Sequence, residues 1–192
     1  MPLPVAHGIV GASVLLALRE PRDKLSLGQT LLLGAALGNL PDVDLALVWL
    51  LDWGNLAHGA MTHSIFFALC VGVVLAGWRR GWRFWRFREA LSYTSATLSH
   101  GVLDMLVRKE FGGAALYWPL SAEKLRFGLF DYFAFYPGSE PLETVVRRAL
   151  QISAYEALLF SPCLLVAGLI YVYRRKALGR EYQTEQWPVR VD

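Results

Sequence analysis

The sequence predicts an all-α membrane protein, a polytopic bundle of about five transmembrane helices with a broken second helix. Hydrophobic residues make up 55% of its 192 residues, and the mean hydropathy of +0.35 is high for a soluble domain. The apolar residues are gathered into long runs, and basic residues cluster beside these runs. We therefore expect one transmembrane helical domain over residues 1–179, followed by a polar, disordered tail over residues 180–192.

Charge and cysteine content argue against several other classes of protein. The formal net charge is +3, but positive-inside topology explains the basic residues, and no basic, aromatic-rich soluble module is present, so nucleic acid is not an expected partner. Cys70 and Cys163 both lie inside apolar runs, which indicates neither a disulfide framework nor a cysteine metal site. The sequence also lacks the motifs of soluble serine and cysteine hydrolases and the glycine loop of nucleotide-binding proteins.

The first two apolar runs predict one short helix and one interrupted helix. Met1–Arg19 lacks the basic start of a signal peptide, so we interpret it as a short first membrane helix. Leu25–Trp53 is long enough, at about 1.5 Å per residue, to cross a hydrocarbon layer of ~30 Å. Gly38 and Asn39 disfavour a continuous helix there, while Pro41 suits the first turn of a second half-helix.

Three more apolar runs complete the predicted spans. They are Thr62–Trp78, Ala90–Val107 and Gln151–Tyr173, and arginines interleaved with aromatic residues follow the first of them. Between the last two runs, Phe111–Leu150 is interrupted by glycine and proline but is rich in aromatic residues. We expect this connection to lie on the membrane surface as an aromatic loop, because it is too polar and interrupted to span the bilayer.

The basic residues also predict the orientation of the chain. With the N-terminus outside and five crossings, most of the 19 lysines and arginines fall in cytoplasmic segments. The same topology places His7, the loop with His58 and His63, and the helix end with His100 and Asp104 on the outer side. We therefore expect a multi-pass membrane protein with one shared site toward its outer face.

Candidate metal ligands occur in short polar stretches inside or beside the apolar runs. His100 and Asp104 are four residues apart in a predicted helix, so their side chains lie about 5–6 Å apart on one face and one ion could bind both. The other predicted ligands are His7, Asp42, Asp44, His58 and His63. Neutral imidazoles mixed with carboxylates suit zinc, with manganese or iron as alternatives. Because these candidates outnumber the ligands of one tetrahedral ion, we expect two or more ions.

Each of these stretches also has a structural explanation. The histidine–aspartate pair can stabilise a helix bundle, the two aspartates after Asn39 can cap a half-helix, and the other histidines can lie at the membrane interface. In a membrane, however, a carboxylate in the hydrocarbon region is costly, so ionisable residues there usually mark function. The concentration of all four histidines and three aspartates on one predicted side favours a metal site.

The same residues carry a resemblance to a known family. The matching elements are the early His-Gly at His7, Leu-Pro-Asp-Val-Asp ending at Asp44, His-Gly-x-x-Thr-His-Ser from His58, Ser-His-x-x-x-Asp-Met-Leu from Ser99 and Tyr-Trp-Pro-Leu around Trp118. In order and spacing, from His7 to Leu129, the chain resembles the bacterial inner-membrane metal-dependent hydrolases that are labelled LexA-binding hydrolases. The resemblance implies a location in the inner (cytoplasmic) membrane, a bound metal and hydrolysis. At Gly59 and Ala60, family members often have Arg-Gly, so this chain lacks their cation there.

These observations combine into a predicted reaction, the hydrolysis of a phosphoester by a metal-activated water. Two ions about 3.5–4 Å apart would activate the water and stabilise the developing charge, with Asp44 in the reacting centre and Lys124 or Arg126 neutralising the substrate. The depth of the site predicts membrane lipids as neighbours and a lipid or lipid-linked substrate. The alternative is a non-enzymatic metal-binding membrane protein, either an ion transporter or a regulatory scaffold of the kind that the LexA label suggests.

Glu156 lies in none of these motifs, and its predicted depth assigns it to the same site. If the last span begins near Leu150, Glu156 lies roughly 9 Å from the outer end, while Asp104 lies roughly 5 Å from Val107. A lone carboxylate at that depth is costly, so we predict Glu156 as a metal ligand or as the general base. The structural alternative is a helix-end carboxylate that is hydrogen-bonded to a neighbour.

Overall fold

The computed structural model describes residues 3–20, 23–45, 58–80, 87–106, 113–129 and 141–185. Over these residues the chain is all-α, as predicted, and contains no β-strand. The α-helices are α1 (Pro4–Leu18), α2 (Leu27–Asn39), α4 (Ile65–Arg80), α5 (Phe87–Leu106) and α6 (Leu142–Glu185). Two short 3₁₀ helices follow α2 and precede α4, namely η1 (Leu40–Asp42) and η2 (Met61–His63).

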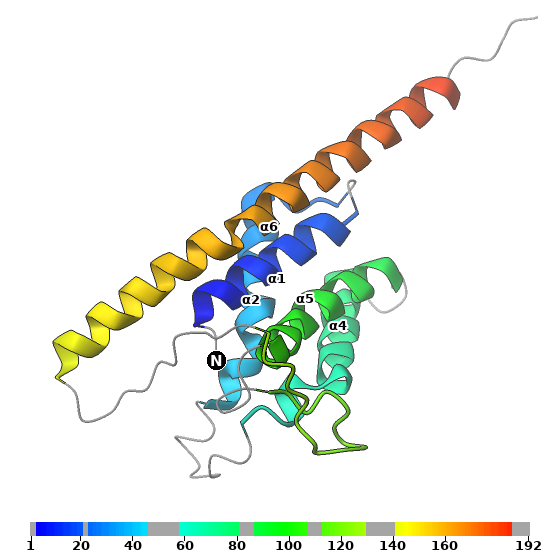
Figure 1. Ribbon diagram of the computed structural model, residues 1–192. Coiled ribbons are helices and arrows are strands. Elements are labelled where there is room, and N and C mark those ends of the chain that lie inside the picture. Colours follow the sequence, from blue (N-terminus) through cyan, green and yellow to red (C-terminus); the bar gives the residue numbers. More distant parts are fainter. Residues whose placement is uncertain are drawn as a thin grey trace, which may run out of the picture.

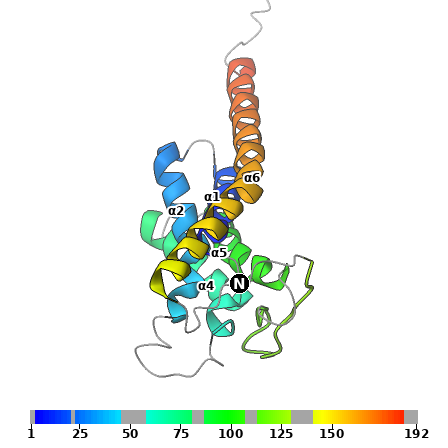
Figure 2. The same cartoon turned by 60° about the vertical axis from the view of Figure 1, so that its left-hand side comes forward.

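Helix α1 is the central helix of the bundle. It packs against α2, α5 and α6, while α4 packs mainly against α5. Figures 1 and 2 show α1 lying along the middle of the long helix α6, and both helices point in the same direction. Glu156 contacts the start of α1, and Arg174 donates a hydrogen bond to the carbonyl of Ala17 near its end. The starts of α1 and α4 and the ends of α2 and α5 meet at one end of the bundle, which we call the site end.

Glycines allow α1 and α2 to pack backbone against backbone. A Cβ on Gly11 would lie 2.7 Å from Gly38 Cα, and a Cβ on Gly34 would lie 2.6 Å from Ala12 Cα. Side chains larger than hydrogen therefore do not fit between the two helices. Small residues at such crossings are typical of helix pairs in membranes, where close van der Waals contact drives association. The crossing brings the end of α2 beside the first turn of α1.

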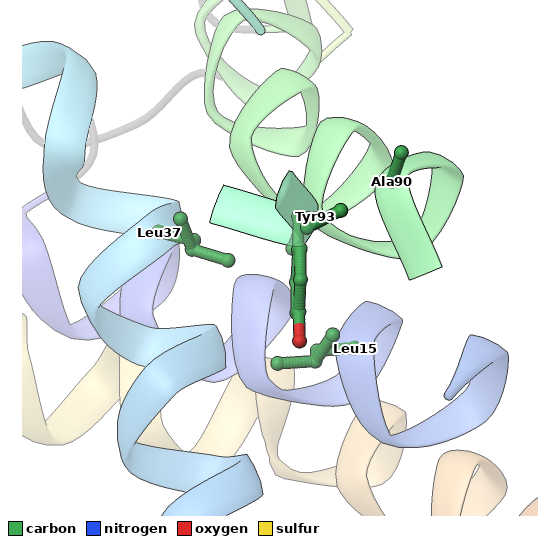
Figure 3. Packing of buried hydrophobic residues seen from close by; sticks show 6 residues of the cluster. Leu15, Leu37, Ala90 and Tyr93 are labelled. Carbon is green, nitrogen blue, oxygen red and sulfur yellow. The ribbon is translucent and has the colours of Figure 1, made fainter. Parts of the chain in front are cut away.

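The main hydrophobic core lies between α1, α2 and α5. Leu15, Leu37 and Tyr93 come from these three helices and are at most 4% exposed. Figure 3 shows their side chains meeting, with Ala90 of α5 in the same cluster. Truncation of a buried leucine of this kind typically costs about 2–5 kcal/mol. This core therefore holds the three helices, and the site end that they form, in a defined arrangement.

Among the described helices, α6 is the one that is both long enough and apolar enough to cross a membrane. Its apolar stretch Leu142–Ala177 comprises 36 residues, and only 11% of its most apolar part is buried in the protein. The apolar helices Pro4–Leu18 and Ile65–Arg79 are shorter. Helix length therefore directly supports one span, and the five-span arrangement stays a prediction.

The helix boundaries differ from the predicted spans at both ends of α6. The helix begins at Leu142, inside the predicted surface connection, because Glu143 and the residues after it favour a helical first turn. It continues to Glu185, into the tail that the sequence predicts to be disordered. The predicted break in the second run is confirmed, since α2 ends at Asn39 and a 3₁₀ turn carries Pro41. Residues 46–57 of that run and 186–192 of the tail lie outside the described residues.

Candidate metal centre

Four elements bring the predicted ligands together at the site end of the bundle. His7 lies in the first turn of α1, Asp42 in η1, His63 in η2, and His100 with Asp104 in the last turns of α5. His100 and Asp104 are at most 1% exposed, and so are His7 and His63. Three overlapping groups have ligand atoms within 4.8 Å of one another: His7–Asp42–His100, Asp42–His58–His63 and His63–His100–Asp104.

Four ligand atoms form the centre of this cluster. The Nε2 atoms of His63 and His100 are 3.1 Å apart, and Asp104 Oδ2 lies 3.3 Å from the first and 3.5 Å from the second. Asp42 Oδ1 lies 3.3 Å from His100 Nε2 and 3.8 Å from His63 Nε2. The ligand atoms of a tetrahedral ion bound at about 2.0–2.2 Å lie roughly 3.3–3.6 Å apart. The spacing of these atoms therefore fits an ion of the size of zinc.

When the two imidazoles are neutral, as metal ligands must be, the hydrogen bonds behind them leave both Nε2 atoms without a proton. His100 Nδ1 lies 2.7 Å from the carbonyl oxygen of Gly38, which only accepts, so Nδ1 carries the proton. His63 Nδ1 lies 3.0 Å from Thr62 Oγ1. That hydroxyl donates its proton to Asp44 Oδ2 at 2.6 Å, so His63 Nδ1 must donate as well. In neutral imidazoles the two facing Nε2 atoms are then acceptors.

With both imidazoles neutral, the four atoms of the centre are all acceptors. Two bare Nε2 atoms and two carboxylate oxygens face one another in a buried space, where unpaired polar groups are costly. Among the described residues at the site end, the buried atoms without a hydrogen-bond partner are His7 Nδ1, His7 Nε2, Asn39 Oδ1, Asp42 Oδ1 and Asp104 Oδ1. The chemistry of this donor set suits a divalent cation, and its mixture of nitrogen and oxygen atoms suits zinc.

His7 and His58 extend the cluster beyond these four atoms. His7 Nε2 lies 3.6 Å from Asp104 Oδ1, the second oxygen of that carboxylate, and its ring stacks on that of His100 with centroids 3.7 Å apart. His58 belongs to the ligand group that also contains Asp42. The three groups overlap at Asp42, His63 and His100. Each of these histidines has one free ring nitrogen, so Asp42 is the overlapping member that can offer an oxygen to each of two ions. The number of ions stays a prediction.

Asp44 lies behind the ligands, although the sequence predicts it among them. Its Oδ1 accepts a hydrogen bond from His58 Nδ1 at 2.7 Å, and its Oδ2 accepts the bond from Thr62. One carboxylate therefore sets the tautomer of His58 directly and that of His63 through the hydroxyl. Asp44 is in none of the ligand groups found among the described residues. Thr62 was not among the predicted residues, although the motif His-Gly-x-x-Thr-His-Ser contains it.

Glu156 lies at the start of α1, which differs from its predicted place among the ligands. Its two carboxylate oxygens accept hydrogen bonds from the backbone N–H groups of Leu3 at 2.6 Å and Ala6 at 3.0 Å. The N-cap residue Leu3 makes no side-chain cap of its own, so Glu156 supplies the cap from α6. The N-terminus of α1 thus compensates the negative charge of Glu156, which the sequence alone assigns to a metal ion. We assign Glu156 to the positioning of α1.

A model of the YdjM inner membrane protein family matches residues 1–177. The chain belongs to the YdjM inner membrane protein family. This match confirms the inner-membrane location that the resemblance implies, while the reaction, the metal and LexA binding stay predictions. No curated protein and no solved structure matches the sequence significantly.

In this YdjM-family chain, residues 113–129 form a loop over the site end, which we call the roof loop. Figure 1 shows it beside the start of α4 and the end of α5. Ala115 donates its N–H to the carbonyl of Gly59 at 2.9 Å, and Ile65 donates its N–H to the carbonyl of Leu116 at 3.0 Å. Gly59 has a φ of +78°, a conformation that other residues rarely adopt. The turn after His58 therefore requires this glycine.

The roof loop places Lys124 beside the cluster. Lys124 Nζ donates to the carbonyl oxygen of His58 at 2.6 Å. The side chains of Asp42 and His58 on this edge are 16% and 18% exposed. Burial lowers the pKa of Lys124, and the positive charge of Arg126 lowers it further. The side chain of Arg126 packs against the backbone at the start of the loop. Lys124 therefore flanks an edge of the YdjM-family cluster that is partly open.

Proposed function

We propose that this inner membrane protein is a metal-dependent hydrolase that cleaves a phosphoester. The observation that carries the proposal is the buried set of four acceptor atoms from Asp42, His63, His100 and Asp104, which a cation would stabilise. Zinc is the proposed metal, with manganese or iron as alternatives. Two or more ions are proposed, because His7 and His58 add candidate ligands beyond the four that one tetrahedral ion takes.

Each part of the site has a role in this proposal. The ligands proposed for one ion are Asp42, His63, His100 and Asp104, and those available to a second are His7 and His58. A divalent ion at such ligands supplies Lewis acidity, which lowers the pKa of a water molecule and balances negative charge on phosphoryl oxygens. Asp44 orients two imidazoles through the hydrogen bonds described above. Lys124 adds a positive charge at the partly exposed edge, where an anionic substrate would approach, and Arg126 is a second candidate cation.

The arrangement of the helices supports a multi-pass topology with the site toward the outer face. The starts of α1 and α4 meet the ends of α2 and α5, as in a bundle whose helices alternate in direction. Helices α1 and α6 run in the same direction. The first and last helices of a chain that crosses the membrane an odd number of times must do so. The basic residues 174–176 lie at the opposite end of the bundle from the cluster, and the positive-inside rule makes that end cytoplasmic.

A non-enzymatic metal-binding role is the second candidate, and the burial of the cluster favours it. Structural metal sites are closed, whereas catalytic sites keep a ligand position open to water. His7, His100 and Asp104 are at most 1% exposed, which is typical of a closed site. The partial exposure of Asp42 and His58 favours the enzyme instead.

Metal analysis and turnover measured on one preparation distinguish these roles. Full-length protein purified in detergent should retain stoichiometric transition metal, and a His100→Ala, Asp104→Ala double variant should lose it while remaining folded. Ser92→Ala on the same helix is the matched control and should keep the metal. Phosphoester hydrolysis that a chelator and the double variant both abolish supports the enzyme, whereas full metal content without turnover supports the non-enzymatic role. Stoichiometric metal in the folded double variant would refute the centre itself.

A further inference from the structure

The roof loop has one buried side and one exposed apolar side. Ala114, Ala115 and Leu116 are at most 8% exposed, and this side packs against the end of α5 and the start of α4. The exposed apolar residues, with their exposed fractions, are Tyr117 (55%), Leu120 (92%), Phe127 (58%) and Leu129 (70%). Exposing apolar surface to water costs about 25 cal/mol per Å². This side of the loop therefore suits an apolar surrounding.

The exposed surface of the loop continues onto the side of the bundle. Phe66 of α4 and Trp118 of the loop are in ring contact, with centroids 6.5 Å apart. Phe66, Leu69 and Val73 follow one another at helical spacing along α4 and are 53%, 47% and 37% exposed. In an inner membrane protein, an exposed apolar helix face of this kind lies against acyl chains. We call the surface formed by this face of α4 and the exposed side of the roof loop the apolar ridge.

A cation stands where the apolar ridge meets the ligand cluster. Lys124 follows Leu120 by four residues on the roof loop, and its ammonium group donates to the carbonyl of His58, a member of the cluster. The ridge matches acyl chains, while an ammonium beside the proposed metal centre matches a phosphate. The chemistry that fits both features together is a phosphate attached to a lipid.

We propose that the roof loop docks a phosphate-bearing lipid of the adjacent leaflet, with its acyl chains on the apolar ridge and its phosphate at Lys124. The inference rests on the proposed function for its reaction, and it deepens that function by making a lipid phosphoester the substrate class. The lipid approaches laterally from the membrane, toward the edge at which Asp42 and His58 are partly exposed. A water-soluble phosphoester would use Lys124 but would leave the apolar ridge without a role.

Fluorescence quenching by nitroxide lipids tests the docking without requiring turnover. A fluorophore is attached at Leu120→Cys in the full chain, in which the exposed Cys70 and Cys163 are replaced by Ser. The protein is reconstituted in phosphatidylcholine nanodiscs that contain a small fraction of nitroxide-labelled phosphatidic acid or nitroxide-labelled phosphatidylcholine. The matched control carries the fluorophore at Glu123→Cys, a polar exposed position on the same loop.

Both nitroxide lipids should quench the fluorophore at position 120 more strongly than the fluorophore at position 123, because Leu120 belongs to the apolar ridge. At position 120, phosphatidic acid should quench roughly two- to fivefold more than phosphatidylcholine, a preference that one part-exposed ion pair can provide. Lys124→Gln should abolish this preference while leaving quenching by phosphatidylcholine unchanged. Excess inorganic phosphate should leave the preference intact.

Three results would overturn the docking of a lipid phosphate. Equal quenching by the two lipids at position 120 would refute the role of the phosphate, and equal quenching at positions 120 and 123 would refute the role of the ridge. Loss of the preference on addition of inorganic phosphate would indicate a site for free phosphate. Since quenching reports binding and does not require hydrolysis, a lipid preference in a protein without phosphoester turnover would uphold the docking and contradict the proposed function alone.

Discussion

Replacement of Glu156 by glutamine tests whether a carboxylate on the last helix holds α1 in place. Both oxygens of this fully buried side chain accept backbone N–H groups of α1, from Leu3 at 2.6 Å and from Ala6 at 3.0 Å. Glutamine keeps the shape of the side chain but offers a single acceptor oxygen, and its NH₂ group would face a donor. Glu156→Gln therefore removes one charge-assisted hydrogen bond and leaves one N–H group unpaired.

The expected loss of stability follows from these two contacts. A hydrogen bond to a charged group contributes about 1.5–3 kcal/mol, and a negative charge at a helix N-terminus contributes about 0.3–1 kcal/mol. We therefore expect Glu156→Gln to lower the free energy of unfolding by about 2–4 kcal/mol. Glu156→Ala removes both acceptors and should lower it further.

Denaturant unfolding in detergent, followed by helical circular dichroism, measures this difference. Gln151→Ala, at an exposed position on the same helix, is the control and should change the free energy of unfolding by less than about 0.5 kcal/mol. Metal content should stay unchanged in Glu156→Gln, because Glu156 binds the start of α1 and is in none of the ligand groups found among the described residues. Loss of metal with unchanged stability would refute this reasoning and return Glu156 to the ligands.

Three further predictions concern the helix crossing, the opposite end of the bundle and the topology. Gly38→Ala should lower the free energy of unfolding by about 1–3 kcal/mol in the same assay, because its methyl group would meet the α1 backbone. Burial alone would raise the pKa of Asp23, but the hydrogen bonds from Arg79 and the Leu25 backbone and the charges of Arg79 and Arg19 together outweigh it and lower the pKa. The stability that this carboxylate contributes is therefore present above about pH 4 and lost as the pH falls further. Acid should then destabilise the Asp23→Asn variant less than the parent protein. Unfolding curves recorded over a series of pH values measure this difference. In intact cells, an impermeant thiol reagent should label Glu123→Cys and should reach Arg175→Cys only after permeabilisation; the reverse pattern would contradict the orientation.

The sequence by itself determines the helical class, the membrane location and most of the residues that form the centre. Apolar runs with basic ends predict membrane helices irrespective of how they pack, and the family match confirms the inner membrane. The break before Pro41 is equally local, because proline lacks the N–H group that a continuous helix needs. His100 and Asp104 share a helix face by their spacing alone, so their joint contribution to the cluster is predictable.

Only the tertiary structure decides which way each polar side chain points. Asp42 and Asp44 stand two residues apart in one motif, yet Asp42 contributes an oxygen to the centre while Asp44 accepts hydrogen bonds behind it. Depth along the last helix places Glu156 near the site end, but its carboxylate turns to the start of α1. Spacing determines neighbours within one helix, whereas a buried polar group takes its partner from whichever element packs beside it. That packing depends on contacts between distant segments, here the glycine crossing of α1 with α2 and the placement of α6 along α1.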